Sequence, residues 1–435
     1  MVKINLPFGR GAMDITVPGE RLNGILQSGT HAYSEQKSEE ELVKEALIAP
    51  VGSQPLSELV RGKRNIVLIA SDHTRPVPSR VILPPVLEEI KKGSPKAVLT
   101  ILIATGFHRP TTRQELIDKF GDGIVNDPAI RFVVHQSDKE EDMVKLGTLP
   151  SGGELLINRV AADADLLMSE GFIEPHFFAG FSGGRKSVLP GVSSRRTVLA
   201  NHCSEFIADA NARTGILEGN PVHRDMVWAA GRAKLAFIVN VVLDANKKVI
   251  RAFAGHFEKA HQAGCAFADK LFGTDAIMSD IVVTTNGGYP LDQNIYQTVK
   301  GMTAAEASCR PGGVIIMCSS CSDGHGGQNF YDLFANEKSE NVIMKRILET
   351  DRNETVPDQW EAQILCRILM NYHVIMVTQA PREMIEAMHM TYAADFEEAL
   401  GLADVYLGKK NAGITVIPDG VSVIIRRHGH QNGVQ

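Results

Sequence analysis

The sequence predicts an α/β protein of two domains, with mainly parallel sheets and an active-site cleft between the domains. Three observations point to this fold class. The chain has 435 residues, more than one ordinary hydrophobic core accommodates. Short apolar runs alternate with segments of helical periodicity along most of its length. Polar side chains follow directly after several apolar runs, where open α/β sheets place their ligands.

The first domain is expected to span residues 1–275. Residues 1–18 alternate between apolar and polar side chains like a strand. Four later apolar runs are typical of buried parallel strands, namely 65–70, 97–104, 130–135 and 164–171. Residues 80–93 and 111–121 have helical periodicity, and Thr112 and Glu115 have the spacing of a capping box. This order of strands and helices predicts a parallel sheet.

The remainder of this domain continues the same pattern. Residues 193–203, 220–233 and 256–273 are predicted to be helical, and residues 234–255 form two strands around a turn at Asp244 to Lys247.

The second domain is expected at residues 276–410. Its predicted strands are 280–285, 313–318 and 373–378, with a helix at 294–309. Residues 411–435 contain the predicted strands 413–418 and 422–427, which could rejoin the first domain. The polar end, residues 428–435, is expected to fray.

The composition limits the class of partner. A net charge of −6 disfavours nucleic acid, whose binding proteins usually carry a basic surplus. No apolar run reaches the roughly 18 residues that a membrane span requires. The start of the chain lacks the apolar segment of a secretory signal. We therefore expect a cytoplasmic protein without nucleic-acid or membrane partners.

The six cysteines do not form a disulfide framework. Cys318 and Cys321 are spaced as a CxxC pair, with His325 nearby, so a redox or metal role is conceivable. No second pair accompanies them, and they end an apolar strand. Two buried thiols are the favoured interpretation.

Polar residues gather after four of the predicted strands. They are Asp72 and Arg75, His108 and Arg109, His176 and Lys186, and finally Tyr289, Gln297 and Lys300. A single loop histidine is more often structural than catalytic. Two loop histidines beside basic residues suit acid/base chemistry near neutral pH. Arg75 and Lys300 suit a small carboxylate.

The segment EPHFFAGFSGGRKSVLPG, residues 174–191, nearly matches a phosphate-binding loop. Arg185 follows Gly184, so Lys186 comes one position too late for that motif. The backbone around Gly183 and Gly184 could still approach an anion. Sixteen residues after Lys186 comes His202, which could line the same pocket.

Five motifs in order, SDHTRP, TGFHRP, EPHFFAGFSGGRKSVLPG, ANH and NGGYPLDQNIYQTVKGM, resemble the nickel-dependent lactate racemases. The resemblance extends from about residue 65 to about residue 330. It implies a nickel-pincer nucleotide, made from nicotinic acid mononucleotide and delivered by cofactor-maturation proteins. It also implies racemisation or epimerisation of a small 2-hydroxy acid, with lactate as first choice. The implied mechanism is proton-coupled hydride transfer through a planar keto acid.

The resemblance also implies roles for individual residues. Lys186 would carry the cofactor covalently, and His202 would bind its nickel. His108 and His176 would be the catalytic acid/base pair. Further cofactor contacts would come from Asp72, Gly183, Gly184 and Arg185. Substrate contacts would come from Arg75, Tyr296, Gln297, Lys300 and Trp360.

Several alternatives remain open at this stage. The substrate could be malate, 2-hydroxyglutarate, phenyllactate or a longer aliphatic hydroxy acid. A second carboxylate would require another cation, for which Arg109 and Arg185 are available. The same histidines could instead serve a dehydratase or a zinc hydrolase, which would be active without maturation. A non-catalytic protein would bind its ligand without turnover.

Overall fold

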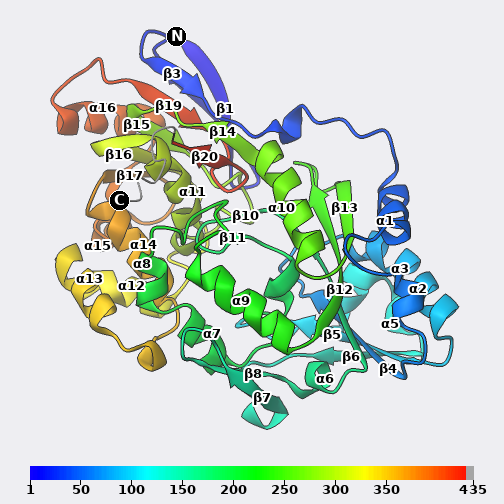
Figure 1. Cartoon of the computed structure of the whole chain (residues 1–435). Helices are drawn as coiled ribbons and strands as arrows, with labels where there is room; N and C mark the ends of the chain where they lie inside the picture. Colours follow the sequence, from blue (N-terminus) through cyan, green and yellow to red (C-terminus); the bar gives the residue numbers. More distant parts are fainter. Residues whose placement is uncertain (428–435) are drawn as a thin grey trace, which may run out of the picture. The chain divides into compact units, whose positions relative to one another are not determined.

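The computed structural model describes residues 1–427, so the predicted fraying of 428–435 lies outside the described residues. The chain forms two compact units (Figure 1). Residues Thr30–Lys270 form one, here called the central unit. Met1–Gly29 and Leu271–Gln435 form the other, here called the terminal unit. Within the described residues, no helix is both long and apolar enough to cross a membrane.

The central unit contains a six-stranded sheet in the order β13-β12-β9-β4-β5-β6. Neighbours are parallel except for β12 and β13, which form a hairpin. The strands are β4 (Asn65–Ser71), β5 (Val98–Ala104), β6 (Ile130–Val134), β9 (Leu166–Phe172), β12 (Leu235–Leu243) and β13 (Val249–Gly255). These positions confirm the predicted strands, because long apolar runs are what a sheet buried on both faces requires.

The core of this unit forms where helices cover the sheet. Alternate residues of β4, such as Ile66 and Leu68, share one cluster with Ile82 and Val86 of α3. The helices are α1 (Glu39–Ile48), α2 (Leu56–Leu59), α3 (Ser79–Gly93), α4 (Arg113–Phe120), α5 (Asp122–Val125), α6 (Arg159–Ala162), α7 (Arg195–Asn201), α8 (Ser204–Ala208), α9 (Pro221–Arg232) and α10 (Lys259–Phe272). Thr112 and Glu115 form the predicted capping box of α4.

Smaller strands complete the central unit. They are the antiparallel pairs β7 (Met143–Thr148) with β8 (Glu154–Asn158), and β10 (Pro175–His176) with β11 (Gly180–Phe181). The second pair lies in the segment that follows β9, so it folds the glycine-rich loop back on itself.

The terminal unit contains a six-stranded parallel sheet in the order β18-β17-β16-β15-β19-β3. Its strands are β3 (Leu22–Ile25), β15 (Ser279–Thr284), β16 (Cys309–Cys318), β17 (His373–Val377), β18 (Thr391–Ala393) and β19 (Ile414–Ile417), with β14 (Gly273–Asp275) and β20 (Ile424–Arg426) as a separate pair. Its helices are α11 (Ile295–Ser308), α12 (Gln328–Ala335), α13 (Glu340–Glu349), α14 (Gln359–Leu369), α15 (Arg382–Ala387) and α16 (Phe396–Leu407).

These units differ from the predicted domain boundaries at both ends of the chain. Residues 1–29 were expected in the first domain, but they lie with residues 271–435. The physical reason is that β3 extends the terminal unit's sheet by pairing with β19. We had predicted that the strands within residues 411–435 could rejoin the first domain. Because β19 pairs with β3 and β15, it belongs to the terminal unit instead. The cleft between the domains stays a prediction.

The first eighteen residues form two strands rather than one. β1 (Val2–Phe8) and β2 (Gly11–Val17) form an antiparallel hairpin whose turn contains Gly9 at a φ of 56°. That left-handed backbone favours glycine and reverses the chain. The alternation of apolar and polar residues does indicate β-structure, as predicted. It continues through the turn, so it could not show that there are two strands.

Cys318 ends β16 and Cys321 follows three residues later, and both are buried, free thiols, as predicted. Burial raises the pKa of Cys318 to about 12 and that of Cys321 to about 11. Both groups are therefore protonated thiols at neutral pH, which disfavours redox chemistry.

Candidate active site

Asp72 and His108 meet beyond the carboxyl ends of two neighbouring strands. Ser71 of β4 and Ala104 of β5 are register partners, so the loops after these residues begin side by side. Asp72 is buried, and its Oδ2 lies 2.7 Å from Nδ1 of His108. The hydroxyl of Thr74 donates to the other carboxylate oxygen at 2.7 Å. Both loops were predicted to line the site.

This pairing fixes the tautomer of His108. Burial raises the pKa of Asp72, but the hydrogen bond and charge of His108, the hydroxyl of Thr74 and the charge of Arg75 together lower it below its usual value. An ionised carboxylate only accepts hydrogen bonds, so Nδ1 of His108 carries a proton. Nε2 of the neutral ring is then the basic atom. His108 can therefore act as a general base while Asp72 stabilises the imidazolium that forms.

Arg75 is exposed on the loop that contains Asp72 and contacts the hydroxyl of Thr74 at 3.2 Å. Arg109, in contrast, has both terminal nitrogens on Glu115, at 2.9 and 2.5 Å. The guanidinium of Arg109 is therefore paired within the protein.

His176 lies on β10, in the loop that follows β9. Its Nδ1 accepts a hydrogen bond from the backbone N–H of Ala179 at 3.2 Å. This bond holds the ring against the turn between β10 and β11.

The ring of Phe178 contacts three of the predicted site residues. His176 lies edge-on to it at a centroid distance of 4.6 Å, and His202 at 5.1 Å. The Lys186 ammonium lies 5.8 Å from the ring centroid. These residues come from β10, from the turn Gly184–Ser187 and from the end of α7. One aromatic side chain therefore gathers them at one place in the central unit.

The chemistry of His202 fits that of a metal ligand. The residue is buried at the C-terminal end of α7, and its Nδ1 lies 3.0 Å from the carbonyl oxygen of Val198. A carbonyl accepts, so Nδ1 is protonated and Nε2 has the electron pair. Burial, followed by the charge of Lys186, lowers the pKa of His202 to about 3. The ring is therefore neutral, as a metal ligand must be.

Gly183 and Gly184 lie in the turn before Lys186, with φ values of 77° and 51°. A Cβ on Gly183 would lie 2.7 Å from Oδ1 of Asn240, and that same oxygen accepts the N–H of Gly184 at 2.7 Å. Glycine is required here by the backbone conformation and by close packing against β12. The predicted cofactor contacts of both glycines stay predictions.

The guanidinium of Arg185 is directed into the protein interior. It donates to the carbonyl oxygens of Ala179 and Phe181, each at 2.7 Å, and to Nδ1 of His223 at 3.0 Å. Burial lowers its pKa to about 10, so it remains charged. These contacts favour a structural role in holding the loop, while the predicted cofactor contact stays a prediction.

Four predicted substrate residues lie in the terminal unit. Tyr296, Gln297 and Lys300 are on α11, and Trp360 is on α14. The Trp360 indole N–H donates to the Tyr296 hydroxyl at 3.1 Å, and the Lys300 ammonium donates to Oε1 of Gln297 at 2.6 Å. The structure groups these residues in two bonded pairs, and their roles stay predictions.

Sequence reasoning missed Glu361, which is buried next to Trp360 in the chain. Burial raises its pKa, while the nearby charge of Lys300 opposes that change. It also missed Phe178, because one aromatic residue among several in FFAGF gives no sign of a special role. The sequence offers no signal for Glu361 except that it follows Trp360. A glutamate on a helix is usually exposed.

Comparisons with known proteins cover both units. A model of the lactate racemase N-terminal domain matches residues 8–215, and a model of the lactate racemase C-terminal domain matches residues 274–425. The chain is 56% identical to the lactate racemase of Thermoanaerobacterium thermosaccharolyticum and 52% identical to that of Lactiplantibacillus plantarum. Each alignment spans 427 residues, 98% of this chain and 100% of the relative.

The solved structure of the lactate racemase apoprotein from Thermoanaerobacterium thermosaccharolyticum has the same fold. Its TM-score is 0.94 at 55% sequence identity, and the match covers 98% of this chain and 100% of that chain. This likeness confirms the predicted α/β class with mainly parallel sheets.

Proposed function

The chain belongs to the lactate racemase family and is therefore an isomerase, and we propose that it interconverts the two enantiomers of lactate. We further propose that it does so as a nickel enzyme whose cofactor is a nickel-pincer nucleotide. The observation that carries this proposal is the arrangement of His176, Lys186 and His202 around the ring of Phe178.

The residues present fit such a cofactor. The amine of Lys186 would attach it covalently, and Nε2 of His202 would bind the nickel. A neutral imidazole is a good ligand for nickel(II), which accepts square-planar nitrogen sites. When bound, the cofactor supplies a reversible acceptor for the α-hydrogen of the substrate. The cofactor-maturation proteins are the partners that this proposal requires.

The chain's own part of the reaction is proton transfer and positioning. His108 accepts the hydroxyl proton at Nε2, and Asp72 stabilises the resulting imidazolium through Nδ1. Arg75 is exposed beside Asp72 and would hold the substrate carboxylate.

His176 serves the opposite enantiomer. The two enantiomers place their hydroxyl groups differently once the carboxylate and α-hydrogen are fixed, so one base cannot reach both. The keto acid formed on oxidation is planar and has lost the chirality of the substrate. Return of hydrogen to either face, with a proton from the histidine on that side, gives either enantiomer.

Two contacts favour lactate over malate or 2-hydroxyglutarate. A second carboxylate needs another cation, and Arg109 and Arg185 were the candidates in the sequence. Arg109 is paired with Glu115, and Arg185 is buried among backbone carbonyl oxygens. Neither guanidinium is available to bind a second carboxylate of the substrate, which supports a monocarboxylate substrate.

The test uses protein matured by the cofactor machinery and a panel of single-enantiomer 2-hydroxy acids. Chiral chromatography should show lactate racemised at least tenfold more efficiently, as kcat/KM, than any dicarboxylate. Unmatured protein is the control and should be inactive. Racemisation of malate faster than lactate would contradict the assignment of substrate. Racemisation of no 2-hydroxy acid at all would contradict the function itself.

A further inference from the structure

We propose that Lys119 is a positioning residue that fixes the Arg75 loop, defined here as residues 72–78, through its ammonium group. This inference rests on the proposed function, because the loop contains Asp72 and Arg75. Lys119 lies on α4, outside every motif on which the family resemblance rests.

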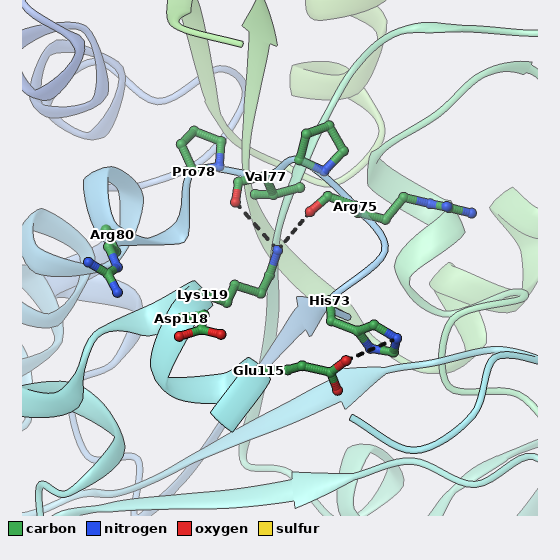
Figure 2. Close-up of a pocket in the computed structure, with 9 residues that line it drawn as sticks. His73, Arg75, Val77, Pro78, Arg80, Glu115, Asp118 and Lys119 are labelled. Carbon is green, nitrogen blue, oxygen red and sulfur yellow. Dashed lines mark hydrogen bonds and ion pairs between the residues drawn. The ribbon is translucent and has the colours of Figure 1, made fainter. Parts of the chain in front are cut away.

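The contacts of Lys119 are with the backbone of the Arg75 loop. Its ammonium donates to the carbonyl oxygen of Arg75 at 3.0 Å and to that of Val77 at 3.4 Å. Figure 2 shows the amine directed between these two carbonyl groups, while the side chain of Arg75 extends away from it. Lys119 therefore holds the backbone and leaves the guanidinium of Arg75 available to a substrate.

The sequence of the loop explains why it needs an external donor. Pro76 and Pro78 follow the two bonded carbonyl groups, and neither has a backbone N–H. The loop can therefore make fewer hydrogen bonds of its own than an ordinary connection of this length. The Val77 carbonyl also accepts the N–H of Ser79 at 2.9 Å, so the charged donor of Lys119 mainly supplies the Arg75 carbonyl and joins it to that of Val77.

The buried carboxyl group of Glu170 interacts electrostatically with Lys119. Glu170 of β9 accepts a hydrogen bond from Ser79, the first residue of α3, at 2.5 Å, and its negative charge acts on Lys119. Its Oε2 has no hydrogen-bond partner among the described residues. Burial lowers the pKa of Lys119, whereas the charges of Glu170 and Asp72 oppose this effect. The charge of Glu170 thus favours the protonated ammonium form of Lys119.

A pocket of about 520 Å³ gives solutes access to Lys119. His73, Arg75, Arg80, Glu115 and Lys119 are among its lining residues (Figure 2). Truncation of Lys119 to alanine would extend this pocket to the two carbonyl oxygens. A small ammonium ion could then occupy the position of the missing amine, which makes the proposal testable by chemical rescue.

The first experiment measures racemisation by matured Lys119→Ala. We expect KM for lactate to rise at least tenfold while kcat changes by less than threefold, because Arg75 binds the carboxylate. Ethylammonium should lower KM again. Tetramethylammonium, which has no N–H group, should not. Lys96→Ala removes an exposed lysine elsewhere and is the matched control. An unchanged KM in Lys119→Ala, or equal rescue by both ions, would overturn the proposal.

The second experiment does not depend on the proposed function. Hydrogen–deuterium exchange of the apoprotein should show about tenfold faster exchange in residues 72–78 of Lys119→Ala, with peptides of β12 unchanged. If the alanine variant does not fold, Lys119→Gln provides the same comparison. Loop exchange equal to that of wild type would refute the positioning role even if racemisation is absent. Faster loop exchange without any racemisation in wild type would refute only the proposed function.

Discussion

The Asp72 carboxylate accepts a hydrogen bond from Nδ1 of His108 over 2.7 Å, and this contact determines which ring nitrogen of His108 is basic. Two adjacent strands, β4 and β5, end at the same level and bring the residues together. The geometry follows from a backbone register that the buried apolar runs of both strands maintain.

Replacement of Asp72 by asparagine should therefore impair catalysis more than binding. The amide can donate to Nδ1 and shift the ring proton to Nε2, where the base is needed. We expect kcat to fall about 10²- to 10⁴-fold, as for other histidines that lose an orienting carboxylate. The measurement is kcat and KM for each lactate enantiomer, with Thr74→Val as a milder comparison. A variant within threefold of wild-type kcat would show that Asp72 does not orient the base.

Single replacements of the two histidines should separate the two enantiomers. With enzyme in excess, His108→Asn and His176→Asn should each form the keto acid from only one enantiomer of lactate, and not the same one. Overall racemisation should be lost in both variants, because each direction needs both steps. Rapid quench followed by detection of the keto acid provides the measurement. Formation from both enantiomers at wild-type rates in both variants would contradict the division of roles.

The buried carboxyl of Glu170 should make stability depend on pH. Burial raises its pKa to about 7 against the opposing charge of Lys119. The folded protein therefore holds this proton more tightly than the unfolded chain, whose pKa is near the ordinary 4.5. Its stabilising contribution is complete below about pH 4.5 and is lost as the pH rises through about 7.

The matched variant is Glu170→Gln, which cannot ionise. Relative to this variant, wild type should lose roughly 3 kcal/mol of unfolding free energy between pH 4.5 and pH 8, since one pKa unit corresponds to about 1.4 kcal/mol. Denaturant unfolding of both proteins at several pH values measures the difference. Parallel stability profiles would show that Glu170 does not titrate in this range.

Local patterns were sufficient to predict most of the secondary structure. The apolar runs that became β4, β5 and β9 are long and bounded by turn residues, so their type was clear. The capping box at Thr112 was equally local. The pairing of β3 with β19 joins residues almost 400 positions apart, and no local pattern encodes such a contact.

The motifs named candidate site residues, whereas the packing around them could not be read from the sequence. The resemblance led to His176, Lys186 and His202, but not to the ring of Phe178 that they share. The resemblance implied a cofactor contact for Arg185, and that contact stays a prediction. Its guanidinium is buried, and one of its partners, His223, comes from α9.

The most direct test of the account concerns Lys186. Wild type and Lys186→Ala would both be matured with the full cofactor machinery and digested, and the peptide containing residue 186 would be weighed. The wild-type peptide should gain the mass of a nucleotide cofactor. The alanine variant should gain none, contain no nickel and not racemise lactate. Racemisation by Lys186→Ala at the wild-type rate would contradict the account.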